Sequence, residues 1–209
     1  MQADWTRGDA RRFAPATARN REPILEVLVR VLPPRGVVLE IASGTGEHAV
    51  AFAERLPMVT FQPSDADPDA RASIDAWRRH ARLPNVRPAL VLDVDTRPWP
   101  LAADAAPDAI LCINLIHIAP WSACLALLDG SAELLRPGAP LVLYGPYRER
   151  GAHTAPSNEV FDASLRERDP AWGIRHLEDV KLEARSAGLK LRERHAMPAN
   201  NLLLLFGTT

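Results

Sequence analysis

The stretch VVLEIASGTGEHAVAFAERL, residues 37–56, joins an apolar run to a glycine turn and an amphipathic segment. Aliphatic and β-branched residues lead up to Glu40, and Gly44 and Gly46 follow it closely. Apolar residues then recur at helical spacing as far as Leu56. The stretch therefore predicts a strand, a tight turn and a helix, with an acidic side chain at the end of the strand.

The same alternation of strands and helices continues along the chain. We expect strands at residues 37–41, 58–62, 86–92, 109–113 and 139–144, with helices at 23–32, 67–81, 120–135, 157–167 and 177–187. Such an alternation is typical of a doubly wound parallel sheet. Two further strands, 189–195 and 201–206, are joined only by AMPAN, so they must form an antiparallel hairpin. The sequence thus predicts an α/β, Rossmann-like, mostly parallel seven-stranded sheet with an antiparallel C-terminal hairpin strand.

Length and charge bound the possible functions. A chain of 209 residues suits one domain, residues 1–209, with an N-terminal cap over residues 1–35. Its 25 basic and 26 acidic side chains nearly cancel, and no long apolar run is present, so we expect a cytoplasmic protein without nucleic-acid or membrane partners. Cys112 and Cys124 lack metal-type spacing, which favours buried thiols over a disulfide or a metal pair. We expect no metal site.

Acidic residues close the first three expected strands. Glu40 would repel the pyrophosphate of a dinucleotide but would attract a ligand that carries an ammonium group. Asp65 suits the two hydroxyls of a ribose, and Asp93 with the backbone N–H of Val94 suits an adenine ring. This combination describes S-adenosylmethionine, and the C-terminal hairpin agrees with a methyltransferase sheet. A nicotinamide- or flavin-dependent enzyme stays open, because GTGEHA also fits the dinucleotide pattern, and so does a plain structural turn.

Several segments resemble the methyltransferase-like protein 26 family of class I methyltransferases over residues 19–206. The segments are ARNREPIL, VLEIASGTGEHA, FQPSDAD, INLIHIAPW, LYGPY, HTAPSN, FDASLRERDPAWGIR and MPANNLLLLF. The resemblance implies a single class I domain that binds S-adenosylmethionine. The residues assigned to this cofactor are Arg19, Asn20, Glu40, Ala42, Ser43, Gly44, Gly46, Asp65, Asp93, Val94 and Asn114.

Two of these assignments carry a reservation from the sequence itself. Ala42 stands where the wider class usually has glycine, although the added methyl group is small. Arg19 can pair with the carboxylate of the cofactor or simply lie in solvent at the start of a helix.

The acceptor side is expected after the fourth and fifth strands. We expect catalytic roles for His117, Tyr144 and Tyr147, with His117 as the base. The alternative for His117 is a structural role, in which its side chain only supports the loop after the fourth strand. We expect residues 145–176 to form a lid or substrate loop. The side chains expected to contact the acceptor are Trp121, His153, Ser157, Asn158 and Asn200. Trp121 can equally belong to the core, and Asn200 to a plain turn.

The sequence therefore predicts an S-adenosylmethionine-dependent methyltransferase. The loop after residue 144 mixes aromatic and neutral hydrogen-bonding groups, so a small, largely neutral acceptor is expected. Two alternatives remain at this point: a nicotinamide-dependent oxidoreductase, and a module that binds S-adenosylmethionine without catalysis.

Overall fold

The computed structural model describes residues 9–101 and 106–208, so residues 1–8 of the expected N-terminal cap lie outside it. Its strands are β1 (Gly36–Ile41), β2 (Val59–Asp65), β3 (Leu90–Val91), β4 (Ala109–Ile113), β5 (Pro140–Pro146), β6 (Arg148–Glu149), β7 (Ala152–His153), β8 (Leu189–Met197) and β9 (Asn201–Thr208). Its helices are α1 (Pro15–Val31), α2 (Glu47–Arg55), α3 (Pro68–Ala81), α4 (Trp121–Leu134), α5 (Pro156–Arg168) and α6 (Leu177–Ser186), with short 3-10 turns η1 (Leu115–His117) and η2 (Pro198–Asn200).

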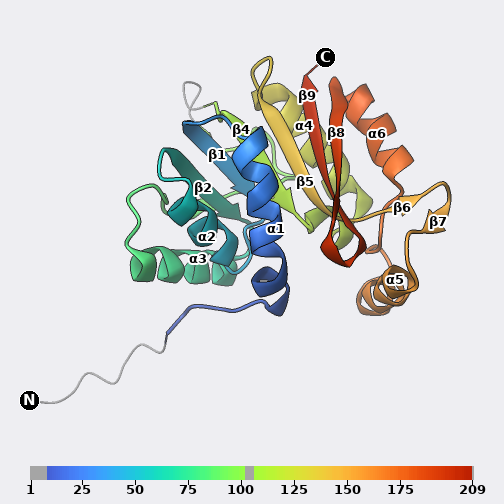
Figure 1. Cartoon of the computed structure of the whole chain (residues 1–209), viewed down its shortest axis with the longest axis horizontal. Helices are drawn as coiled ribbons and strands as arrows, with labels where there is room; N and C mark the ends of the chain where they lie inside the picture. The colour runs from blue at the N-terminus through green and yellow to red at the C-terminus, as the bar shows by residue number, and fades with distance from the viewer. Residues whose placement is uncertain (1–8, 102–105, 209) are drawn as a thin grey trace, which may run out of the picture.

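Seven strands form one sheet in the order β3-β2-β1-β4-β5-β9-β8 (Figure 1). The pairs from β3 to β5 are parallel, whereas β9 is antiparallel to both β5 and β8. This arrangement confirms the predicted mostly parallel sheet with a reversed C-terminal strand. Parallel strands align their carboxyl ends, so the segments that follow β1, β2 and β4 meet at one edge of the sheet.

Helices cover both faces of the sheet (Figure 1). Val38 of β1 packs in a core with α1 and α2, while Leu39 and Ile41 pack in a second core with α4 and α6. The period of two along a strand explains this division, because successive side chains point to opposite faces. Cys112 and Cys124 are free and buried, as expected. Within the described ranges, no helix combines the length and the apolar character that crossing a bilayer requires.

The predicted start of the first helix at Pro23 is wrong. Helix α1 begins at Pro15, and Pro23 lies inside it. Both prolines suit a first helical turn, but the interior proline costs one backbone hydrogen bond, which the buried Ile24, Leu25 and Leu28 offset by packing on the sheet. The extra residues form about two turns and bring Arg19 and Asn20 to the functional edge of the sheet.

Two other segments also depart from the prediction. The third strand is much shorter than residues 86–92: Val86 makes one isolated bridge to Phe61, and the ladder resumes only at Leu90, because Pro88 between them has no N–H to donate. The helix expected at 157–167 is confirmed as α5, but the β6–β7 hairpin was not predicted. Strands of two residues carry no measurable periodicity.

Candidate functional site

The turn between β1 and α2 has an unusual backbone. Ala42, Gly44 and Gly46 have φ values of 53°, 59° and 87°, all in the left-handed region. A Cβ atom at Gly46 would lie 2.7 Å from the backbone Cα of Ile74, so glycine is required there. Ala42 adopts a backbone conformation that favours glycine. This left-handed conformation costs an alanine about 1–2 kcal/mol relative to a right-handed one.

Asp65 connects this turn to the end of β2. Its Oδ2 accepts a hydrogen bond of 2.9 Å from the N–H of Gly44, and its Oδ1 accepts one of 3.0 Å from the N–H of Asp67. Ser64 and Ser43 strengthen the same junction, because both hydroxyls donate to the carbonyl oxygen of Glu40. The carboxylate of Asp65 is therefore held at a fixed place beside the glycine turn.

Glu40 is a buried acid at the end of β1. Its side chain is about 1% exposed, and its Oε2 has no hydrogen-bond partner. Burial raises the pKa of Glu40 to about 8, with a smaller contribution from the nearby charge of Asp65 and an opposing one from hydrogen bonding to Ser43. Glu40 is not among the lining residues of either pocket described below, so its unpartnered Oε2 lies behind the surface of the site.

A smaller pocket of about 150 Å³ lies along the ends of β1 and β2. It is lined by Ile41, Ala42, Asp65, Ala66, Leu92, Asp93, Val94, Asp95, Leu115, Ala119, Pro120 and Ala123. The structure therefore brings together Ala42, Asp65, Asp93 and Val94, as the sequence predicted for one binding site. Three carboxylates and apolar side chains form its wall, and the described lining includes no lysine or arginine.

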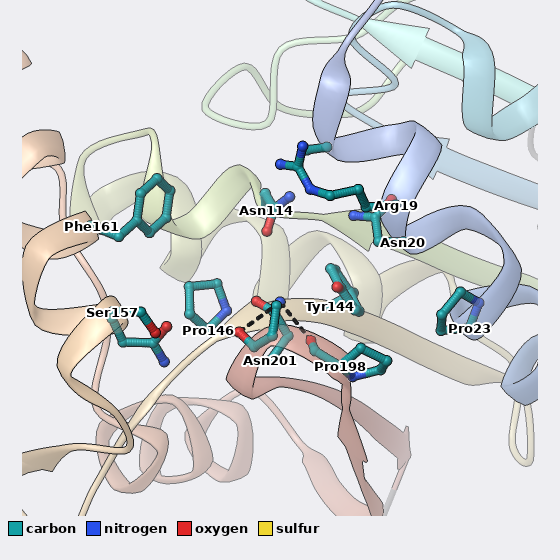
Figure 2. Close-up of a pocket in the computed structure, with 13 residues that line it drawn as sticks. Arg19, Asn20, Pro23, Asn114, Tyr144, Pro146, Ser157, Phe161, Pro198 and Asn201 are labelled. Atoms are coloured by element: carbon teal, nitrogen blue, oxygen red, sulfur yellow. Dashed lines mark hydrogen bonds between the residues drawn. The ribbon is translucent and has the colours of Figure 1, made fainter.

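A larger cavity of about 460 Å³ lies on the other side of the turn that follows β4. Its lining residues are Ala16, Arg19, Asn20, Pro23, Asn114, Tyr144, Pro146, Ser157, Asn158, Phe161, Pro198, Ala199 and Asn201. Figure 2 shows Arg19, Asn20 and Pro23 on α1 at one side of this cavity, and Ser157 and Phe161 on α5 at the other. Asn114 and Leu115 are neighbours in the chain, yet one lines the larger cavity and the other the smaller pocket, so the two spaces are adjacent.

The wall formed by α5 is fastened to the C-terminal hairpin. The Asn158 amide donates to the carbonyl oxygen of Asn200 and to the hydroxyl of Thr154, each at 3.0 Å. Asn200 itself does not appear among the lining residues, whereas its neighbour Asn201 does and is held by a 3.1 Å hydrogen bond to Pro198 (Figure 2). Asn200 therefore supports the wall from outside the cavity.

Comparison with known protein families identifies the family to which this chain belongs. Residues 11–208 match the family described as "Protein of unknown function (DUF938)". The chain belongs to this family.

Several solved structures similar to this DUF938 chain are named as methyltransferases, one of them as S-adenosylmethionine-dependent. The methyltransferase SibL in its apo form is 20% identical (TM-score 0.75; 92% of this chain and 55% of that one). An O-methyltransferase family 2 protein from Planctomyces limnophilus, in complex with apigenin, is 18% identical (TM-score 0.78; 99% and 63%). The methyltransferase CalO1 of calicheamicin biosynthesis, with S-adenosylhomocysteine bound, is 14% identical (TM-score 0.72; 93% and 55%). The chain spans about three fifths of these proteins or less, and the shared feature is the class I methyltransferase fold.

The structure places His117 of the DUF938 chain inside the protein rather than on the cavity wall. Its side chain is about 1% exposed, and neither ring nitrogen has a hydrogen-bond partner. The ring packs edge-on against Tyr147, with centroids 5.2 Å apart, and Tyr147 is fully buried as well. Burial lowers the pKa of His117 to about 3. Neither side chain lines the larger cavity, whereas Tyr144 does.

Trp121 and His153 also lie away from the larger cavity. Trp121 borders a separate pocket and lies under the guanidinium of Arg175, 5.6 Å from the ring centroid. His153 Nε2 lies 3.5 Å from Asp162 Oδ2, so it braces α5. Of the residues expected to contact an acceptor, Ser157 and Asn158 line the larger cavity.

The sequence analysis missed several residues of the site: Pro146, Phe161 and Asn201 line the larger cavity, Asp95 lines the smaller pocket, and His48 contacts the cavity wall from behind. His48 of α2 is buried, and its Nε2 lies 2.9 Å from Oδ1 of Asn20 in the cavity wall. The two residues are 28 positions apart, and no local pattern links them. Only the placement of α1 over α2 brings them together.

Replacement of Gly145 by alanine is expected to lower the free energy of unfolding by about 1–3 kcal/mol, the usual cost of overfilling a core. A Cβ at this position would lie 2.4 Å from Nε2 of His117, which has no room to move within the core. Thermal or urea unfolding measures the change. Gly207→Ala is the matched control, because the nearest atoms there belong to the flexible side chain of Arg192, at 3.3 Å and beyond. Equal stability of the two variants would show that His117 is not packed against β5.

Proposed function

We propose that this chain is an S-adenosylmethionine-dependent methyltransferase for a small acceptor, acting as a single domain over residues 1–209. The observation that carries the proposal is the acidic wall of the smaller pocket, where Asp65, Asp93 and Asp95 meet with no described basic residue. Such a wall disfavours the pyrophosphate of a dinucleotide and suits an adenosine without phosphates. The fold of the solved relatives and the resemblance to the methyltransferase-like protein 26 family support the same cofactor.

The proposal assigns each part of the cofactor to described residues. Asp65 binds the ribose hydroxyls, and Asp93 with the N–H of Val94 binds the adenine. Glu40 pairs with the ammonium group, because its buried Oε2 has no partner in the protein. Asn114 and Arg19 lie beside the larger cavity and take the carboxylate, while Ala42, Ser43, Gly44 and Gly46 form the turn that supports these groups.

The larger cavity then holds the acceptor. Its volume of about 460 Å³ lies within the usual range of small-molecule sites, about 300–1,000 Å³. Tyr144, Ser157 and Asn158 contact the acceptor, and residues 145–176 act as a lid through α5. We assign His117 and Tyr147 a supporting role, since a proton acceptor must reach the group that it deprotonates. Methyl transfer is an in-line displacement, so the main task of the protein is alignment.

Saturating S-adenosylhomocysteine is expected to raise the melting temperature by about 5–10 °C. A ligand at one hundred times its Kd adds about 2.7 kcal/mol, and a chain of this size shifts by about 2–4 °C per kcal/mol. NADH at the same concentration is the control and is expected to have no effect. A rise with NADH alone would instead support an oxidoreductase.

A protein that binds S-adenosylmethionine but does not transfer its methyl group would be a non-catalytic binding module. Incubation with methyl-labelled S-adenosylmethionine and a small-molecule extract separates these cases, because a methyltransferase moves the label into an extract component. Label that stays entirely in the cofactor across diverse extracts would favour the binding module.

A further inference from the structure

A separate pocket of about 290 Å³ lies between strand β6, the last turn of α5 and the first turn of α6. Figure 1 shows the β6–β7 hairpin between these two helices. Its polar and aromatic lining residues are Trp121, Arg148, Arg166, Arg175, His176 and Asp179, and we call this space the basic pocket. None of them lines the larger cavity or the smaller pocket, so the proposed methyl transfer does not use them.

Arg175 is held in place by backbone carbonyl groups. Its Nε donates to the carbonyl oxygen of Ile116 at 2.8 Å. Its Nη2 donates to those of Ala119 and Ala171 at 2.7 and 2.9 Å. The guanidinium also lies over the ring of Trp121, 5.6 Å from the centroid. Nη1 has no hydrogen-bond partner among the described residues, so a fixed guanidinium keeps one donor group for a ligand and loses little side-chain freedom on binding.

Arg148 is a half-buried cation on β6 with few partners. Its Nε is enclosed by the protein and has no hydrogen-bond partner, and its Nη2 donates to the carbonyl oxygen of Gly151 at 3.3 Å. Within the described ranges, neither Arg148 nor Arg175 takes part in an ion pair. A partly desolvated charge is costly unless an opposite charge compensates it. Both guanidinium groups therefore lack a compensating anion in the protein itself.

The third guanidinium, that of Arg166, already has an acidic partner. Its Nε lies 3.2 Å from Oδ2 of Asp162. A Cβ on Gly173 would lie 2.7 Å from Nη2 of Arg166, so this guanidinium packs against the backbone between α5 and α6. Asp179 is the one carboxylate in the described lining, and it is exposed, so solvent screens its charge. An excess of positive charge remains in the basic pocket.

This charge distribution suits an oxyanion with two negative charges. A guanidinium matches the oxygens of a phosphate or a carboxylate and can bind two of them at once. A singly charged carboxylate would compensate only one of Arg148 and Arg175, whereas a phosphate monoester carries nearly two negative charges at neutral pH. The volume lies just below the usual range of small-molecule sites, about 300–1,000 Å³, so the ligand must be small.

We propose that the basic pocket binds a phosphate group, either inorganic phosphate or the phosphate of a small metabolite. Arg148 and Arg175 bind its oxygens, and the exposed Arg166 adds a weaker contact. The inference goes beyond the proposed function and does not depend on it, because these residues line neither the smaller pocket nor the larger cavity.

Calorimetry on the protein without other ligands tests the proposal with inorganic phosphate, phenyl phosphate, acetate and chloride at one ionic strength. Phosphate or phenyl phosphate is expected to bind about tenfold or more tightly than acetate, and chloride is expected to give no saturable binding. Tighter binding of phenyl phosphate would identify a phosphorylated metabolite as the ligand, and tighter binding of phosphate would identify the free ion. Acetate that binds as tightly as both phosphates, or no saturable binding of either phosphate, would overturn the proposal.

Variants then locate the bound phosphate. Arg148→Gln is expected to weaken phosphate binding by about tenfold or more. Arg150→Gln is the matched control, because it removes the same charge from an exposed position of the same hairpin outside the pocket lining, and it is expected to bind normally. Arg19→Gln, in the larger cavity, is also expected to bind normally. Equal weakening by Arg148→Gln and Arg150→Gln, or a loss in Arg19→Gln alone, would contradict the assigned site.

Arg166→Gln keeps the test decisive if Arg148→Gln does not fold. The side chain of Arg166 is 46% exposed, so its replacement disturbs the interior less. Its loss is expected to weaken phosphate binding by about two- to fivefold, as for an exposed ion pair, with Arg150→Gln again unchanged. Wild-type affinity in a folded Arg166→Gln protein would remove the phosphate from the basic pocket.

Discussion

Glu40→Gln is expected to make the free protein more stable above pH 8 by several kcal/mol. The folded-state pKa of Glu40 is raised from 4.5 to about 8, chiefly by burial. Between pH 4.5 and about pH 8 the Glu40 side chain has lost its proton in the unfolded chain and has kept it in the folded chain. The free energy of unfolding therefore falls as the pH rises through this interval. The interval spans about 3.5 pH units at about 1.4 kcal/mol per unit, which sets a ceiling of about 5 kcal/mol. Glutamine is neutral throughout and removes this loss.

Urea unfolding at a series of pH values measures this effect. Below pH 4.5 the wild type and the variant are expected to have similar free energies of unfolding, and the curves separate as the pH approaches 8. Glu54→Gln, at an exposed position of the neighbouring helix α2, is the control and is expected to follow the wild type. A Glu40→Gln variant that is less stable than the wild type by the same amount at every pH would mean that Glu40 is already ionised in the free protein.

The same carboxyl group links cofactor binding to proton release. An ammonium group beside Glu40 favours its ionised form, so binding of S-adenosylmethionine between pH 5 and 8 is expected to release a proton from the wild type. Calorimetry in buffers of different ionisation enthalpy detects this release, and the Glu40→Gln variant is expected to lack it. Equal release from both proteins would place the ammonium elsewhere.

The sequence predicted most of the sheet because the apolar composition of a strand shows whether one or both of its faces are buried. The continuous apolar run at residues 109–113 corresponds to β4, which packs against a hydrophobic core on each face of the sheet. The predicted bounds of this strand match the observed ones. The short linker AMPAN left only an antiparallel hairpin. The start of α1 was missed because two prolines both suit a first turn and because Thr17 is the one buried residue that the structure describes between residues 15 and 22.

The site was predicted only where strand ends determine it. Asp65 and Asp93 follow neighbouring parallel strands, so their meeting in the smaller pocket follows from topology alone. The direction of His117 does not follow from topology, since the short turn η1 carries no periodicity that would show which side faces the core. The only sequence signal for its burial was a glycine, Gly145, inside an apolar strand, which indicates a close approach by another group. The contact between His48 and Asn20 depends on how α1 packs over α2, which no local pattern records.

Asp65→Ala is expected to weaken S-adenosylmethionine binding by about 10- to 150-fold, the range that corresponds to losing hydrogen bonds of a charged group worth about 1.5–3 kcal/mol. In the free protein the same carboxylate accepts hydrogen bonds from the backbone of Gly44 and Asp67, so its removal leaves two N–H groups without their partner and loosens the turn as well. Asp65→Asn keeps one side-chain oxygen and can satisfy only one of these N–H groups, so an intermediate loss is expected. Asp69→Asn, whose side chain is 71% exposed on α3, is the control and is expected to bind normally. Calorimetry on variants with a wild-type melting profile makes the comparison. Wild-type affinity in a folded Asp65→Ala protein would mean that the ribose does not lie beside β2, and the cofactor would then have to bind somewhere other than the smaller pocket.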